Sequence, residues 1–472
     1  MRSWGLAALI CLTSCGSHPN DTPSDAPSTQ HDARMIDAPR AIDADLTAST
    51  DTPIVPCTDS AADVYVVAAR PNAPLGTILA CAVDPVLAAA DIPALVGDHI
   101  TVTSAVKQYR IAYQTRDGNG GPAVSTARVY LPSTPRARPV PLAVAIHGSV
   151  GLADNCVPSV DSDNSLPLPY AARGFATIAP DLAGLGNAGT QDYLDNHAQG
   201  WQTLDGARAL RALLPPGLTA PELVITGYSQ GGGAALSAHA LIHSDGAGIG
   251  TLVATAVYAP EWPISAKSFD YEPILRDPTQ LTIIEGLSYS SVAVMRQYAF
   301  LENHVGDGHG KQAVPSQFQA NLETNIQSQC LVALGGYIQT SMLHTGDLIE
   351  PTLRTSLLAC MDNQAGCTGD GSAYFTFMQD NILAPDPGVG PVLIVAGALD
   401  LIMPPAKEGS CIANKLTTAG VDVDTCVISD ADHSNIMEHH WKGLAWAESV
   451  MAGGARTECS PVAAMPACTN RG

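Results

Sequence analysis

A serine flanked by glycines is the residue of this 472-residue chain with the strongest setting for chemistry. It lies in the segment Gly227-Tyr228-Ser229-Gln230-Gly231, directly after an apolar run and directly before an Ala-rich stretch. A G-x-S-x-G pattern between a strand and a helix is typical of a sharp turn that exposes a nucleophilic serine. The bare pattern is weak evidence in a Gly-rich chain, so its setting carries the prediction that Ser229 is a nucleophile.

A serine hydroxyl needs a base, and two residues later in the chain fit that requirement. Asp400 comes directly after one apolar run and His433 directly after the next. If these runs are parallel strands, Ser229, Asp400 and His433 meet at one edge of a sheet, in the order serine, acid, histidine. His433 would take the serine proton, and Asp400 would hold the imidazole in the right tautomer.

Other acids and histidines are available for these roles. Asp430 and Asp432 share a loop with His433, so they are poorly placed to orient its ring. His439 and His440 lie within the helix expected after this loop, where solvated or packing roles are expected. Three more histidines fall in a helical insertion: His304, His309 and His344.

The charge that develops on a substrate oxygen needs two N–H donors. The backbone N–H of Gln230 begins the helix after the serine, and we expect the second from Ser149, in the loop after the strand Leu142–Ile146. His147 in that loop is assigned a structural role. No cofactor or metal is predicted. Gly184–Gly189 matches the dinucleotide-binding pattern G-x-G-x-x-G but does not open a clear helix. Arg116–Gly121 is expected to be a turn and not a calcium loop.

Continuous apolar runs predict the elements that position these residues, because strands covered on both faces are apolar throughout. A hairpin is expected over 108–131, and helices over Leu204–Leu214 and Gly232–Ile242. Strands that alternate with helices predict an α/β fold with a mostly parallel sheet. The predicted buried strands are 141–146, 174–179, 222–226, 252–257, 391–396 and 425–428. About 264–387 lacks such runs and is expected to be an inserted, mainly helical cap, with helices near 291–301, 317–322 and 331–338.

The N-terminus predicts export. Residues 1–15 read as a signal peptide, and Leu12-Thr13-Ser14-Cys15 resembles a bacterial lipobox, in which the cysteine is lipidated. Residues 16–56 are rich in Asp, Pro, Ser and Thr and predict a disordered tether, and the hydrolase domain is expected over 57–472. We expect membrane anchoring through the lipid on Cys15, at the outer membrane or cell surface of the envelope; ordinary secretion is the alternative.

Composition excludes several classes of protein. The formal net charge of -22 argues against nucleic-acid binding, and 46% hydrophobic with 14% charged residues argues against disorder of the whole chain. No apolar run approaches the ~20 residues of a membrane-spanning helix. The 12 cysteines, without a C-x-x-C pair, favour an oxidising compartment. Oligomeric state is left open.

Several segments resemble the secretory lipase family of the α/β-hydrolases, the lipase-A type. They are Pro74–Leu79, Asp154–Ser159, Gly174–Gly186, Leu204–Ala209 and Gly227–Ser229, together with Asp400 and Asp432-His433. The resemblance runs from about residue 75 to 433. It implies an α/β-hydrolase fold with a helical cap, hydrolysis of carboxylic esters under a lid, and a Cys156–Cys330 bridge between core and cap. The family often has an Asp in the loop that here reads His147-Gly148-Ser149.

These observations predict a lipase or esterase that forms an acyl-enzyme and acts on an ester or lipid. A serine peptidase or acylaminopeptidase on the same residues is the alternative, and a non-catalytic binding lipoprotein is the candidate from another class. Ten cysteines would remain after Cys11 is removed with the signal and Cys15 is lipidated. Proximity in the sequence suggests four further bridges: Cys57–Cys81, Cys360–Cys367, Cys411–Cys426 and Cys459–Cys468.

Overall fold

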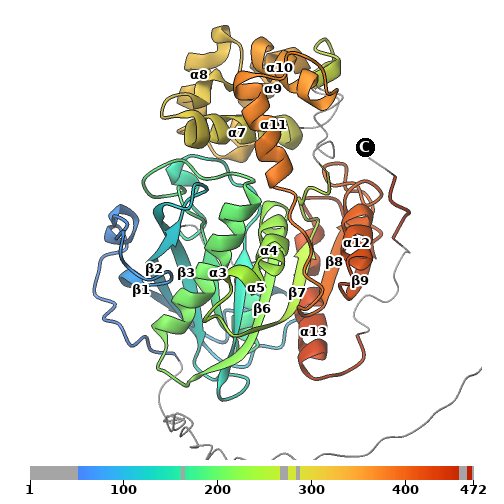
Figure 1. Cartoon of the computed structure of the whole chain (residues 1–472). Helices are drawn as coiled ribbons and strands as arrows, with labels where there is room; N and C mark the ends of the chain where they lie inside the picture. Colours follow the sequence, from blue (N-terminus) through green and yellow to red (C-terminus); the bar gives the residue numbers. More distant parts are fainter. Residues whose placement is uncertain (1–50, 161–164, 266–274, 283–286, 457–464, 470–472) are drawn as a thin grey trace, which may run out of the picture. The chain divides into compact units, whose positions relative to one another are not determined.

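The computed structural model describes residues 51–160, 165–265, 275–282, 287–456 and 465–469 (Figure 1). The expected signal peptide, Cys15 and the tether up to residue 50 lie outside the described residues. Within the described part, no helix combines the length and apolar character needed to cross a bilayer.

A mostly parallel sheet runs through the described chain. Its nine strands follow the order β1-β2-β3-β5-β4-β6-β7-β8-β9. The six strands from β5 to β9 are parallel to one another, whereas β1, β2 and β3 join them as antiparallel neighbours. The strands are β1 Ile78–Leu87, β2 Val106–Arg116, β3 Pro122–Pro132, β4 Val140–Ile146, β5 Ala176–Pro180, β6 Thr219–Tyr228, β7 Thr251–Tyr258, β8 Val392–Gly397 and β9 Val423–Ile428. The predicted α/β architecture is therefore confirmed.

Burial on both faces explains why the apolar runs are strands. Every residue of β4 is buried, and alternate side chains enter different cores. Leu142 and Val144 pack in the core that contains helices α3 (Asn196–Leu213), α4 (Gln230–Ala240) and α12 (Gly409–Thr418). Ala143 and Ala145 pack with α2 (Pro167–Ala172) and α13 (His440–Met451) on the other face. All six predicted buried strands and the hairpin of β2 and β3 are present. The edge strand β1 was not predicted, because its second half is largely exposed and lacks a continuous buried run.

Helices cover both faces of the sheet (Figure 1). They are α1 Pro93–Val96, α2 Pro167–Ala172, α3 Asn196–Leu213, α4 Gln230–Ala240, α5 Ile242–Asp245, α12 Gly409–Thr418 and α13 His440–Met451. Short 3-10 helices occur at η1 Asp63–Val66, η2 Asp154–Cys156 and η7 Ile436–His439. The helices predicted over 204–214 and 232–242 correspond to α3 and α4.

The residues between β7 and β8, which we call the cap segment, are helical wherever the structure describes them, apart from turns, connecting loops and one isolated β-bridge. The main helices group together in Figure 1 and share a core around Met295, Leu334 and Leu357. They are α7 Leu287–Phe300, α8 Ser316–Ile326, α9 Leu331–Ser341, α10 Pro351–Met361 and α11 Gly369–Asp380. Shorter ones are the π-helix η4 Leu301–Val305 and the 3-10 helices η5 Gly310–Ala313 and η6 Thr345–Asp347.

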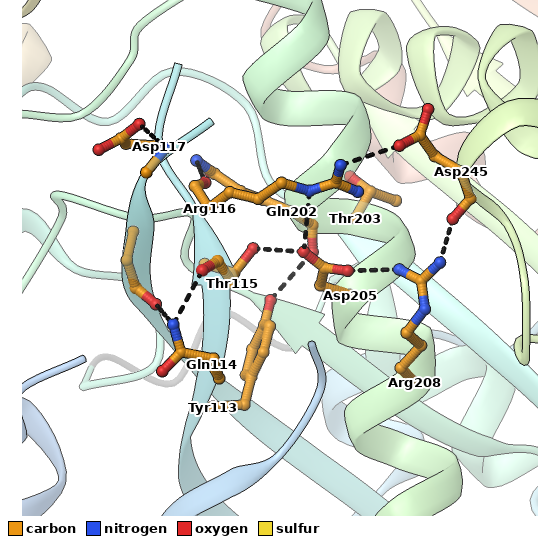
Figure 2. Close-up of polar contacts among 12 residues, drawn as sticks. Tyr113, Gln114, Thr115, Arg116, Asp117, Gln202, Thr203, Asp205, Arg208 and Asp245 are labelled. Atoms are coloured by element: carbon orange, nitrogen blue, oxygen red, sulfur yellow. Dashed lines mark hydrogen bonds and ion pairs between the residues drawn. The ribbon is translucent and has the colours of Figure 1, made fainter. Parts of the chain in front are cut away.

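A buried polar network ties the β2–β3 hairpin to α3 (Figure 2). Thr115 Oγ1 donates to Asp205 Oδ2 at 2.8 Å, and Arg208 pairs with the other carboxylate oxygen of Asp205. Gln202 Nε2 donates to the carbonyl of Arg116 at 3.0 Å. Burial raises the pKa of Asp205, while Thr115 and the arginines oppose that shift. These contacts hold the end of the hairpin against the middle of α3.

Four disulfides join described cysteines: Cys57–Cys81, Cys156–Cys330, Cys360–Cys367 and Cys411–Cys468. The bridge Cys156–Cys330 implied by the family resemblance is present. The suggested pairs Cys411–Cys426 and Cys459–Cys468 are wrong, because Cys411 bonds to Cys468; Cys426 is also disulfide-bonded, but not to Cys411. Sequence proximity misled here because the C-terminal segment returns to α12 and to the loop before it, where Thr469 N–H donates to the carbonyl of Ala406 at 2.9 Å.

Removing Cys156–Cys330 should cost more stability than removing Cys360–Cys367, because the first bridge closes a loop of 174 residues and the second a loop of 7. Chain entropy predicts losses of about 5 and about 2 kcal/mol. Urea unfolding of the variants Cys156→Ser/Cys330→Ser and Cys360→Ser/Cys367→Ser measures both. Equal losses would contradict this explanation.

Candidate active site

Ser229 lies at the junction of β6 and α4 in a strained backbone conformation. Its φ of 53° and ψ of -117° are rarely adopted by residues other than glycine. Three backbone hydrogen bonds maintain it: Ser229 N–H donates to Tyr258 O at 2.9 Å, and Ser229 O accepts from Gly233 and Glu261, both at 3.1 Å. Local strain that surrounding structure maintains is a common property of reactive sites.

The two flanking glycines are required by close backbone contacts. A Cβ on Gly227 would lie 2.0 Å from the carbonyl oxygen of Gly231, and a Cβ on Gly231 would lie 2.2 Å from that of Ile146. The second contact brings the end of β4 directly against the start of α4. The glycines therefore permit the sharp turn and the close approach of the loop that begins at His147.

Gly231→Ala is expected to destabilise the protein by more than about 3 kcal/mol, because backbone must move to admit the methyl group. Gly336→Ala is a matched control: this glycine lies in helix α9 with no heavy atom within 4 Å of the new Cβ. The control should be neutral or slightly stabilising. Thermal unfolding compares the two, and similar melting temperatures for both variants would show that the contact at Gly231 is not required.

The structure brings Ser229, His433 and Asp400 together. His433 Nε2 lies 3.0 Å from Ser229 Oγ, and His433 Nδ1 lies 2.8 Å from Asp400 Oδ2. The three residues follow β6, β9 and β8, whose parallel order places their carboxyl ends at one edge of the sheet. This is the arrangement expected from the sequence, and both distances lie within hydrogen-bond range.

The carboxylate of Asp400 is oriented by its own loop. Its Oδ1 accepts backbone N–H bonds from Ile402 at 2.9 Å and Met403 at 2.7 Å. Asp400 is only 2% exposed, so solvent competes little for these contacts. The remaining oxygen, Oδ2, is thereby directed at His433.

The competing residues are occupied elsewhere. Asp432 Oδ1 accepts from the N–H groups of Ser434 and Asn435, which lower its pKa, and the residue is exposed. His440 contacts the carbonyls of Met437 and Val96 through its two ring nitrogens, consistent with the packing role expected for it.

Tyr228 is a part of the site that sequence reasoning missed. Its hydroxyl donates to the carbonyl of His433 at 2.7 Å, and the two ring centroids are 5.2 Å apart. Burial raises the pKa of Tyr228, so this hydroxyl remains a donor at neutral pH. Tyr228 occupies the first variable position of the G-x-S-x-G segment. Because the pattern does not specify that residue, it gave no reason to select the tyrosine.

The two expected oxyanion donors have free backbone N–H groups. Within the described part of the chain, neither the N–H of Gln230 nor that of Ser149 forms a hydrogen bond. The Ser149 hydroxyl is 2.6 Å from the Tyr193 hydroxyl, and His147 Nε2 is 3.1 Å from the carbonyl of Asp181. His147 thus has a structural contact, as expected for it. The side chains of His147 and Ser149 hold the loop, and the backbone N–H of Ser149 remains available as a hydrogen-bond donor.

The G-x-G-x-x-G segment forms a loop between β5 and α3. Helix α3 begins only at Asn196, several residues after Gly189. The direct strand–glycine–helix arrangement of a dinucleotide site is therefore lacking at this position.

Two carboxyl groups near the site have raised pKa values. Burial raises the pKa of Glu261, whose N–H donates to Ser229 O, and the charge of Arg296 on α7 opposes the shift. Burial and the charge of Glu261 raise the pKa of Glu408 to about 8. At neutral pH Glu408 is therefore mostly protonated, which limits the negative charge around Asp400.

Comparison with known proteins identifies relatives only through structure. No family model matches the chain, and no curated protein matches by sequence. The cell wall degrading esterase LipA from Xanthomonas oryzae aligns with a TM-score of 0.59 at 19% identity, covering 80% of this chain and 97% of that one. A protein from Legionella pneumophila gives a TM-score of 0.61 at 15% identity, covering 80% of this chain and 100% of that one.

Candida antarctica lipase A in its closed state aligns with a TM-score of 0.59 at 17% identity, covering 83% of this chain and 86% of the lipase. These alignments span most of each protein. The chain therefore has the α/β-hydrolase fold of these esterases and lipases.

Proposed function

We propose that this protein is a serine hydrolase that cleaves carboxylic esters through an acyl-enzyme. The observation that carries the proposal is the continuous hydrogen-bonded chain from Ser229 Oγ through His433 to Asp400 Oδ2, built on a strained turn at the sheet edge. Each group in that chain has a chemical task in acyl transfer.

The geometry supports a two-step reaction. His433 Nε2 accepts the proton as Ser229 Oγ attacks the ester carbonyl carbon, and Asp400 stabilises the imidazolium that forms. The N–H groups of Gln230 and Ser149 would bind the oxygen that becomes negative. His433 then donates its proton to the departing alcohol. Water, activated in turn by His433, releases the acid and restores Ser229.

Esters are favoured over amides because two structurally similar proteins are an esterase and a lipase. The same three residues could also serve a peptidase or acylaminopeptidase. No contact among the described residues specifically favours that activity. The acid, base and nucleophile are all in hydrogen-bond range, which argues against a purely binding role.

A direct comparison of substrates tests the proposal. The purified chain should hydrolyse p-nitrophenyl esters and leave peptide p-nitroanilides largely intact. Esters of graded acyl length would then define the preferred chain. Faster turnover of the anilides would establish the peptidase instead, and no turnover on a broad ester panel would overturn hydrolase function.

A further inference from the structure

Three side chains with metal-binding donors that the proposed acyl transfer does not use meet between the loop before α3 and the cap segment. Asp192 and Asp195 come from the loop, and His304 comes from the π-helix η4. One donor atom from each lies within 4.8 Å of the other two. Single-turn π-helices occur frequently at functional sites.

Asp192 is held in place from both sides. The N–H of Gly118, in the turn of the β2–β3 hairpin, donates to Asp192 Oδ2 at 2.8 Å. Asn303, the neighbour of His304 on η4, donates through Nδ2 to Asp192 Oδ1, also at 2.8 Å. These bonds fix the carboxylate while leaving further lone pairs on both oxygens.

Asp195 presents one oxygen without a hydrogen-bond partner. Its Oδ1 caps α3 by accepting from the N–H groups of His197 and Ala198. Its Oδ2 forms no hydrogen bond with any described residue and lies 3.8 Å from His304 Nε2, too far for one. Asp195 as a whole is only 4% exposed, and it lines an open cavity together with His304.

His304 is oriented by packing and not by hydrogen bonds. Its ring stacks on Phe300 with centroids 5.4 Å apart and contacts Phe377 at 5.1 Å. Neither ring nitrogen forms a hydrogen bond within the described part of the chain. The imidazole is thus held by aromatic neighbours with its nitrogen lone pair available.

The cluster lacks a compensating cation. Within the described residues, neither Asp192 nor Asp195 forms an ion pair with a lysine or arginine. Two buried carboxylates without a lysine or arginine partner are costly in the charged form, and a bound cation would offset that cost.

An open cavity gives a route to the cluster. It has a volume of about 1060 Å³, and its lining includes Asp195, His304, Gly118 and Trp201. A hydrated ion could therefore reach Asp195 Oδ2 and His304 Nε2 from solvent.

We propose that Asp192, Asp195 and His304 bind a divalent transition-metal ion of the Zn²⁺ class. One imidazole and two carboxylates suit such an ion better than Ca²⁺, which prefers oxygen ligands alone. At metal–ligand distances of about 2.1 Å, tetrahedral binding would draw the donors together by about 1 Å and leave one position for water.

The ion would join the cap segment to the core. Gly118 and Asp192 belong to the region where the hairpin and α3 are already tied by Thr115, Asp205 and Gln202 (Figure 2). His304 belongs to the cap segment. Metal binding would therefore fasten η4 to a pre-existing rigid base.

Zinc binding by the purified full chain tests this proposal. After treatment with chelator and dialysis against Zn²⁺, metal analysis should find one ion per chain. Substitution of Co²⁺ should give the visible absorption of a four- or five-coordinate site. His304→Gln should lower the zinc affinity by at least about tenfold. Loss of a residue that only hydrogen-bonds to a metal ligand already lowers metal affinity by about 10- to 100-fold. His344→Gln, an exposed histidine elsewhere in the cap segment, is the matched control and should bind normally.

Hydrogen exchange of the wild-type chain supplies a readout that needs no variant to fold. Zn²⁺ should increase amide protection in 301–305 and 192–198 and leave α8 unchanged. Absence of zinc binding, equal affinity in wild type and His304→Gln, or stabilisation by Ca²⁺ but not by Zn²⁺ would each overturn the assignment.

Discussion

Ser229→Ala is expected to lower kcat/KM for esters by about 10⁴- to 10⁶-fold and to abolish labelling by a serine-directed phosphonate. The reason is that Ser229 Oγ is the atom aligned with His433 Nε2, at 3.0 Å. The oxyanion donors and substrate contacts would remain, so a small residual rate is expected. Steady-state hydrolysis and intact-mass analysis of the labelled chain measure the two effects.

Ser434→Ala is the matched control for this variant. Ser434 is exposed and follows His433 directly, and it contributes its backbone N–H to the turn of Asp432. It should retain near wild-type activity and labelling. Phosphonate labelling that survives in Ser229→Ala would show that another residue is the nucleophile and would refute the proposed function.

Asp400→Asn is the second substitution with a large expected effect, about 10⁴-fold on kcat. The amide can keep the contacts with Ile402 and Met403 through its oxygen, but then presents an NH₂ group to His433 Nδ1. That favours the tautomer with the proton on Nε2, which cannot accept a proton from Ser229. The loss should appear mainly in kcat, with unfolding free energy changed much less.

Asp432→Asn tests whether the acid was assigned correctly. Asp432 adjoins His433 in the sequence, but its carboxylate caps the turn at Ser434 and Asn435. Asn can form the same acceptor bonds, so activity should fall less than tenfold, of the order expected for an exposed turn residue. A larger loss in Asp432→Asn than in Asp400→Asn would reverse the assignment.

Much of the fold followed from local pattern. The parallel strands were recognisable because a strand covered on both faces must be apolar throughout, as in β4. Edge strand β1 was missed because exposure interrupts that pattern. The helices α10 and α11 of the cap segment were not predicted individually, although they pack on the same local core as the predicted α7, α8 and α9.

Ser229, Asp400 and His433 were predictable because the order of parallel strands converts positions in the sequence into positions along one edge. The contact between Tyr228 and His433, and the free N–H of Ser149, depend on how separate loops pack, which no local pattern encodes. The lipid anchor on Cys15 and the envelope location stay predictions from the N-terminal sequence.

The sequence by itself determined the parallel α/β architecture and the three residues proposed for acyl transfer, because each buried strand is marked by a local apolar run and the carboxyl ends of parallel strands meet at one edge of the sheet. Only the tertiary structure decided that Cys411 pairs with Cys468 and that Asp192 and Asp195 meet His304. Those contacts join segments far apart in the sequence. Their partners are selected by the packing of the whole domain, so spacing alone could not reveal them.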